Sequence, residues 1–294
     1  MNRCLTSYGA GAVILVVACA LPGCSDETAV ERAAGAPPPN VAHRVPSDYP
    51  TIQAAIDAAA LGDTVLVAPG TYTGPGNRNI TFPIGSLVLM SEGGPSETIL
   101  DCQGTDSSYQ QGMTVTNGQD NIFIRGFTIK NAYAGSGAAI YISFASPDIR
   151  DCVFINNSAP IAGGAIWCKS GSPAIRRCTF IGNWSESGGA AFLNASGTSI
   201  FADCLFAYND SGAAVWVNRS EAMPAMFCCN IFGNPEGDWV ERIAGLESVN
   251  NNMSVDPRLC GDAAAGFRLE ADSPCLPQNN ACGRLIGAIE LLCD

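Results

Sequence analysis

A repeat of about 26 residues runs through the middle of the chain and restricts its fold more than any other feature. Each copy contains a short apolar run that ends in asparagine. The starts of the first four copies are 26 residues apart, and a fifth copy follows after 25. The copies span residues 126–131, 152–157, 178–183, 204–209 and 229–234. A fixed period of this length indicates a repeat architecture.

Each period carries three short β-prone runs, which Gly, Pro and Asn separate. No run in the repeats has helical spacing or helical length, so leucine-rich and other helix-containing repeats do not fit. A unit of three short strands cannot bury its apolar side alone, whereas stacked copies form parallel sheets around one continuous core. The sequence therefore predicts an all-β solenoid, clearest over residues 112–234.

Two columns of identical residues follow from the stacking. Asparagine recurs once per coil, where it can adopt left-handed backbone and bond to the asparagine of the next coil. Cysteine precedes it in most coils and is predicted to point inward as a small apolar residue. The asparagines are Asn131, Asn157, Asn183, Asn209 and Asn234, and the cysteines are Cys152, Cys178 and Cys204.

The coil sequence GGAIW…SPAIRRCTFIGN resembles the repeats of the pectin-lyase-like superfamily of right-handed parallel β-helices. Residues 49–72 are similar to the N-terminal cap of that superfamily. In this interpretation Thr51 opens an amphipathic helix with Ile52, Ala55, Ile56 and Ala59 on one face. The resemblance implies a right-handed parallel β-helix solenoid over residues 45–294.

The last part of the chain, residues 256–294, resembles the closing segment of many such bacterial proteins. The resemblance makes its four cysteines candidates for disulfides, but their pairing cannot be read from the sequence. These candidates are Cys260, Cys275, Cys282 and Cys293.

Residues 1–23 have the features of an export signal: Arg3, a short apolar stretch and small residues at the end. Leu21-Pro22-Gly23-Cys24 resembles a bacterial lipobox, which implies lipidation of Cys24 and an outer-membrane or cell-surface lipoprotein. Ordinary cleavage after Ala20 is the alternative, and it would give a periplasmic or secreted soluble protein. Residues 24–44, small, charged and proline-rich, are predicted to form a flexible tether.

Charge and residue content exclude several classes of function. The chain has 15 basic and 27 acidic residues and no basic run, which argues against nucleic-acid binding. Its one histidine, His43, is expected in the tether, so catalysis by Ser-His-Asp or Cys-His groups lacks a base. We expect no metal site and no cofactor, with Ca²⁺ relevant only if the protein is a lyase.

Charges alternate along one column: Arg125, Asp151, Arg177 and Asp203. Neighbouring coils would pair these charges, and the column is first interpreted as a set of structural ion pairs. The alternative follows from the family resemblance. Arg177 or Lys169 would then act as the base of a polysaccharide lyase near Asp151 or Asp203.

A third column carries aromatic residues. In the run around Trp167, alternation puts Ile166 and Cys168 on one face and Trp167 and Lys169 on the other. If the first pair points inward, Tyr141, Trp167 and Trp216 form an outward stripe that can contact sugar rings, with Trp184 beside it. The opposite register would bury these aromatic residues in the core.

Three functions remain open. The first is a non-catalytic cell-envelope β-helix that presents a face to polysaccharide or to a partner and is held at the membrane by its lipid anchor. The second is a polysaccharide lyase or another carbohydrate-active enzyme. The third is a purely structural surface protein.

Overall fold

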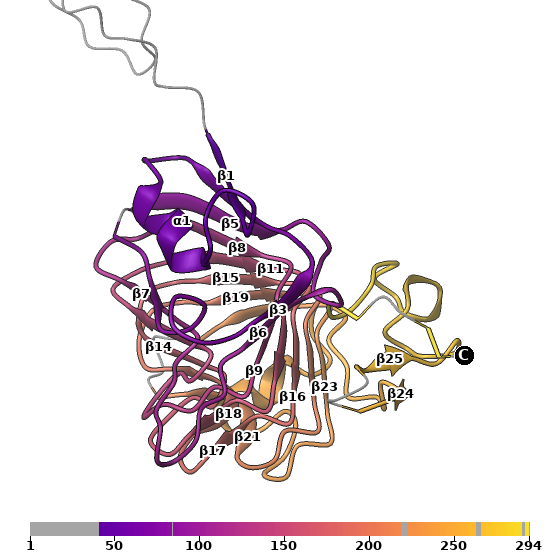
Figure 1. Ribbon diagram of the computed structural model, residues 1–294. Helices are drawn as coiled ribbons and strands as arrows, with labels where there is room; N and C mark the ends of the chain where they lie inside the picture. Colours follow the sequence, from indigo (N-terminus) through magenta and orange to yellow (C-terminus); the bar gives the residue numbers. More distant parts are fainter. Residues whose placement is uncertain (1–40, 84, 219–222, 263–265, 290–291, 294) are drawn as a thin grey trace, which may run out of the picture. The chain divides into compact units, whose positions relative to one another are not determined.

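The computed structural model describes residues 41–83, 85–218, 223–262, 266–289 and 292–293. The predicted signal segment, most of the predicted tether and Cys24 lie outside the described residues. Within them, the chain forms a parallel β-helix whose strands lie on three sheets (Figure 1). No helix among these residues has both the length and the apolar character needed to cross a bilayer.

Sheet A has eight strands, each pairing in parallel with the strand of the next coil. Its strands are β1 (Ala42–Val45), β2 (Thr64–Val67), β5 (Ser86–Ser91), β8 (Asn121–Arg125), β11 (Asp148–Arg150), β15 (Ala174–Arg176), β19 (Ile200–Ala202) and β22 (Ala225–Phe227).

Sheet B follows sheet A in each coil and has seven strands. Its strands are β3 (Gly70–Tyr72), β6 (Thr98–Asp101), β9 (Thr128–Lys130), β12 (Val153–Ile155), β16 (Thr179–Ile181), β20 (Leu205–Ala207) and β23 (Asn230–Phe232).

Sheet C completes the coil with six strands. They are β4 (Ile80–Thr81), β7 (Met113–Thr116), β10 (Ile140–Ser143), β14 (Ile166–Ser170), β18 (Gly189–Asn194) and β21 (Ala213–Val217). A short parallel pair, β13 (Ser158–Ala159) and β17 (Trp184–Ser185), lies between sheets B and C along the chain.

The core lies inside the three sheets, where side chains at equivalent positions of successive coils stack on one another. Phe154, Phe180 and Phe206 stack with ring centroids 4.7 Å apart at both steps, close to the spacing of adjacent strands. The predicted cysteine column is buried beside them, and its members are free thiols. Inward side chains therefore pack mainly on their own equivalents one coil away.

The N-terminal end of this core is covered as the sequence predicts. Thr51 caps helix α1 (Ile52–Ala58), and its hydroxyl accepts a hydrogen bond from the Ala54 amide at 3.3 Å. Ile52, Ala55 and Ile56 on the inner face of this helix are fully buried. The helix thus shields apolar side chains that the first coil would otherwise expose to water.

One boundary differs from the prediction. Strand β1 begins at Ala42, so residues 42–44 belong to the β-helix and not to the tether. His43 is buried, and its Nε2 lies 2.9 Å from Asp63 Oδ2. Residues 42–45 pair with β2, which explains why a segment without repeat character is ordered in the first coil.

The asparagine column forms a ladder over four coils. The side-chain amide nitrogens of Asn157, Asn183 and Asn209 each donate to the Oδ1 of the next asparagine, at 3.1, 3.0 and 2.8 Å. The last acceptor is Asn234. These buried amides satisfy one another where water cannot reach them.

Asn131 does not belong to this ladder. Strand β9 pairs with β12 so that Lys130 faces Ile155, which places Asn131 beside Asn156, one residue before the ladder. Asn131 has a φ of 54° and donates to Asp101 instead. The left-handed backbone predicted for the asparagines therefore occurs at the residue before each ladder asparagine, such as Asn156 and Gly182.

The C-terminal segment folds back over the outer face of sheet B (Figure 1). It contains the 3-10 helix η3 (Pro277–Asn279) and the antiparallel strands β24 (Leu259–Cys260) and β25 (Arg268–Leu269). A second 3-10 helix, η2 (Glu241–Leu246), precedes it. Buried side chains from this tail and from the outer face of sheet B form a second, smaller core.

Two disulfides join the tail, and one of them includes a cysteine that was not among the predicted candidates. Cys260 pairs with Cys293, whereas Cys282 pairs with Cys228 of the last regular coil. Cys275 is a buried free thiol, so its prediction as a disulfide residue is wrong. Cys275 lies in the second core, where it packs as a small apolar side chain.

Candidate functional site

The aromatic column lies on the outer face of sheet C. Tyr141, Trp167, Leu193 and Trp216 pair in register on β10, β14, β18 and β21. Their strand neighbours Ile140, Ile142, Ile166 and Cys168 are fully buried. The alternation of the strands therefore directs the aromatic side chains outward.

The column is half-buried and is interrupted once. Tyr141 and Trp167 meet edge to face with ring centroids 5.3 Å apart. Leu193, only 4% exposed, separates Trp167 from Trp216. The Trp216 indole nitrogen donates to Asn218 at 2.9 Å, whereas the buried Trp167 Nε1 has no acceptor among the described residues.

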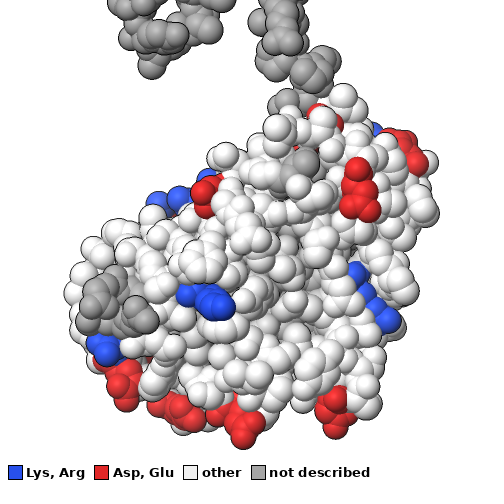
Figure 2. Space-filling view, turned by 90° about the vertical axis from the view of Figure 1, so that its left-hand side faces the viewer, with Lys and Arg blue, Asp and Glu red and all other residues white. Residues whose placement is uncertain are grey.

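Two further predicted residues border this column. Lys169 is exposed on β14, two residues after Trp167. Trp184 is half-buried on β17, which pairs with β13. The side of the domain that carries β7 and β14 has few charged side chains, with acidic residues gathered at its lower edge (Figure 2).

The charged column lies at the turns between sheets A and B. The Arg125 guanidinium donates to Asp151 at 2.8 Å, and Arg177 pairs with the other carboxylate oxygen of Asp151. A parallel group on β11 and β15 joins Asp148 to Arg150 and Arg176, both at 2.6 Å.

The register of this column differs from the prediction. Arg125 pairs with Arg150, and Gly126 takes the position equivalent to Asp151. Asp203 does not extend the column, because its carboxylate accepts from Arg284 of the tail at 3.0 Å. The first repeat aligns one residue differently from the later ones, which explains both this shift and the displacement of Asn131.

The pKa values of Asp148 on β11 and of Asp203 are shifted in opposite directions. Burial raises the pKa of Asp203 more than the nearby Arg284 and Arg177 lower it. At Asp148 burial acts in the same direction, but hydrogen bonds and charges from Arg150 and Arg176 leave the pKa below its ordinary value. Asp148 is therefore the better-stabilised carboxylate.

Only one of the two bases proposed for a lyase lies near the proposed carboxylates, because Arg177 is beside Asp151 and Lys169 is not. Lys169 lies on sheet C, whereas Asp151, Asp203 and Arg177 lie at the turns between sheets A and B. Arg177 is held in its ion pair with Asp151. Within the described ranges, no group of three or more His, Cys, Asp or Glu side chains is arranged to hold a metal ion.

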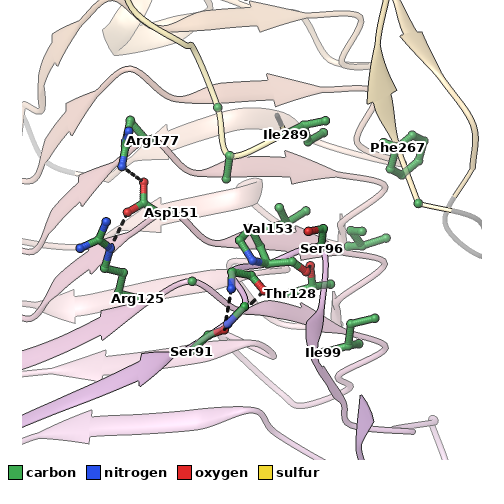
Figure 3. A pocket seen from close by; sticks show the side chains of 18 of the residues that line it. Ser91, Ser96, Ile99, Arg125, Thr128, Asp151, Val153, Arg177, Phe267 and Ile289 are labelled. Carbon is green, nitrogen blue, oxygen red and sulfur yellow. Dashed lines mark hydrogen bonds and ion pairs between the residues drawn. The ribbon is translucent and has the colours of Figure 1, made fainter. Parts of the chain in front are cut away.

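A groove of about 860 Å³ lies between the outer face of sheet B and the tail (Figure 3). Ile99, Thr128 and Val153 line it from sheet B, and Phe267 and Ile289 line it from the tail. The Arg125–Asp151–Arg177 group borders it, as does the β5–β6 loop, where the Gly94 amide donates to the Ser91 hydroxyl at 2.8 Å.

Sequence reasoning singled out three of the charged residues that line this groove, Arg125, Asp151 and Arg177, but missed Lys130. A signal was present: Lys130 follows Thr128 and Ile129 at the position where later repeats have Ile155, Ile181 and Ala207. The tail residues gave no comparable signal, because the tail does not repeat.

Among the comparisons with known proteins, a family model identifies the fold. A family model for the right-handed beta helix region matches residues 91–253. Among solved structures, the pectin methylesterase from Aspergillus niger matches with 16% identity and a TM-score of 0.40, covering 69% of this chain and 80% of that chain. A search of the curated proteins finds no match. From the family match, together with the stacked parallel coils, the chain belongs to the right-handed beta helix family.

Proposed function

We propose that the protein is a non-catalytic β-helix of the bacterial cell envelope that binds polysaccharide through the aromatic column of sheet C. The observation that carries this proposal is the outward register of Tyr141, Trp167 and Trp216 on coils of one sheet. A rigid row of aromatic side chains suits sugar rings, because each side chain offers a large apolar surface at little cost in conformational entropy.

The polar groups beside the column support the same ligand class. Lys169 and Asn218 are exposed at the same face and can bond to hydroxyl groups.

The scarcity of charge on this side of the domain favours a neutral polysaccharide over a polyanion (Figure 2). The predicted anchor at Cys24 would hold the domain at the membrane, with residues 25–40 as the tether. The column would then face the polysaccharides outside the cell.

The test is glycan binding by the purified protein and by Trp167→Ala combined with Trp216→Ala. A panel of neutral and acidic polysaccharides is measured by affinity electrophoresis or calorimetry. We expect the double variant to lose at least tenfold in affinity, since each stacking side chain contributes about 1 kcal/mol or more.

Phe123→Ala is the matched control. Phe123 is 41% exposed on β8 of sheet A, so its removal deletes an exposed aromatic ring from a different sheet. Binding that survives in the double variant, or that falls equally in Phe123→Ala, would show that the column is not the binding surface.

A further inference from the structure

The described residues of the tail cover the outer face of sheet B on the later coils and leave the earlier coils open. Ile286, Ala288 and Ile289 of the tail are buried in the second core with outward side chains of the later coils, such as Ile181 and Leu205. The Ala288 amide donates to Thr179 Oγ1 at 2.9 Å, and the Gly287 amide donates to the Asp203 carbonyl at 2.8 Å. A segment of the tail is therefore already bound to part of this face through apolar side chains and backbone amides.

The open coils present a different outer surface. On the covered coils, the last outward position of each strand in sheet B holds Ile155, Ile181 or Ala207. The same position on the open coils holds Lys130 on β9 and Asp101 on β6. The face changes from apolar to charged where the cover ends.

The groove is the continuation of the covered face. Thr128 occupies the column of Thr179, separated from it by Val153. Its hydroxyl donates to the Pro95 carbonyl at 2.7 Å, so its oxygen remains able to accept a second bond. Thr128 thus offers to a ligand the acceptor that Thr179 offers to the tail, with Phe267 as an apolar wall (Figure 3).

The charge of the groove is opposite to that of the whole chain. Four cationic residues line it, Arg125, Lys130, Arg177 and Arg268, against two acidic residues, Glu92 and Asp151. The chain as a whole carries a net charge of −12. Local positive charge within a negative protein selects for an anionic ligand at short range.

The acidic side chains of the groove are already neutralised. Asp151 is paired with Arg125 and Arg177, and Glu92 with Arg44. Lys130 is half-buried and has no ion pair among the described residues. Asp101 of β6 is in register with Lys130 but accepts a hydrogen bond from Asn131 instead. The Lys130 ammonium, in a groove with apolar walls, therefore attracts the carboxylate of a ligand.

We propose that this groove binds an extended acidic peptide of a partner protein, in which apolar and acidic side chains alternate. The tail supplies the precedent for a peptide, since it lies on the adjacent coils through apolar side chains and a backbone amide to Thr179. The apolar side chains of the partner contact Ile99, Val153 and Phe267, and a carboxylate pairs with Lys130.

The experiment uses the purified protein and a fluorescent peptide of alternating valine and glutamate, with binding followed by anisotropy. We expect saturable binding that weakens as NaCl rises from about 0.05 to 0.5 M. Lys130→Ile repeats the residue of the neighbouring coils, so it is expected to fold, and it should bind about tenfold more weakly. Lys130→Gln removes the same charge while keeping a polar side chain and should give a similar loss.

The matched control is Arg242→Gln, which removes an exposed cation of η2 outside the groove and should leave binding unchanged. Ile99→Trp fills the groove without a change of charge and should also weaken binding. A peptide of alternating valine and lysine should not bind. Equal binding by wild type and both Lys130 variants would overturn the proposal, as would binding of oligogalacturonate without binding of the acidic peptide.

Discussion

The side-chain amide of Asn157 donates to Asn183 Oδ1 at 3.1 Å, and the same oxygen also accepts the Asn157 backbone amide at 3.1 Å. Both asparagines are fully buried. The side-chain oxygens of Asn183, Asn209 and Asn234 therefore each join two coils through two hydrogen bonds. This arrangement fixes the spacing of the coils at the turn as firmly as the strands fix it within the sheets.

Replacing Asn183 by leucine should destabilise the protein strongly. The backbone and side-chain amides of Asn157 would lose their acceptor, and Asn209 Oδ1 and the Phe154 carbonyl would each lose one donor. Each group left unsatisfied costs about 1–3 kcal/mol. Asn131→Gly is the matched control, because Asn131 lies outside the ladder and glycine keeps its left-handed backbone. Urea unfolding followed by circular dichroism should show a much larger loss for Asn183→Leu, and equal losses would contradict the ladder's role.

The cysteines should divide into two chemical groups. Burial raises the pKa of Cys102 and of Cys168 to about 12, so these thiols stay protonated and unreactive at pH 8. Ellman's reagent should therefore react with them only after denaturation. Peptide mapping should recover Cys275 as a free thiol and Cys282 linked to Cys228, and a disulfide that includes Cys275 would contradict the structure.

The pair of His43 and Asp63 should make stability depend on pH in acid. Hydrogen bonds from His43 and then from the Ala60 and Val41 amides lower the pKa of Asp63 to about 2. The unfolded carboxyl titrates near 3.9, so folding favours the ionised form. This contribution is complete above about pH 4 and disappears as the pH falls through 2.

The measurement is the difference in unfolding free energy between wild type and Asp63→Asn over this range. The difference should shrink between about pH 4 and pH 2, because only the wild type loses the ionised carboxylate. Asp57→Asn, in which an acidic residue is replaced on the exposed side of α1, should show no such trend. A constant difference for Asp63→Asn would mean that the pair does not stabilise the folded state through its charge.

Lipidation of Cys24 can be tested in cells. A palmitate analogue should label the wild-type protein, and Cys24→Ala should abolish the label and release the protein from the membrane fraction. Cys19→Ala, in the predicted signal segment, serves as the control and should keep the label. Incorporation that persists in Cys24→Ala would refute lipidation at that residue, whereas a wild-type protein without label would favour ordinary cleavage after Ala20.

The protein should not cleave uronate polysaccharides. Lys169 is separated from Asp151 and Asp203 by its place on another sheet, and Arg177 is held in an ion pair. Incubation with pectate, alginate or glycosaminoglycan in the presence of Ca²⁺ should produce no unsaturated product that absorbs in the ultraviolet. Release of such a product, lost in Arg177→Ala, would identify the protein as a lyase.

Because the sequence repeats, it determined how the coils stack. The period of 26 residues required stacked parallel strands, since a single unit has too little apolar surface to fold alone. The same repetition predicted the inward cysteines and the ladder from Asn157 to Asn234, because equivalent residues of stacked coils must meet. The cap was readable for a different reason: Thr51 and the apolar face behind it are local helix signals.

Only the tertiary structure decided the features that do not repeat. The one-residue shift at Asn131 depends on strand register. Side-chain packing between coils sets this register, and a sequence alignment does not reveal it. The pairing of Cys228 with Cys282 and the ion pair between Asp203 and Arg284 depend on where the tail lies. The groove at Lys130 exists because that tail stops short, and contacts between distant segments of a chain, unlike a period, leave no regular pattern in the sequence.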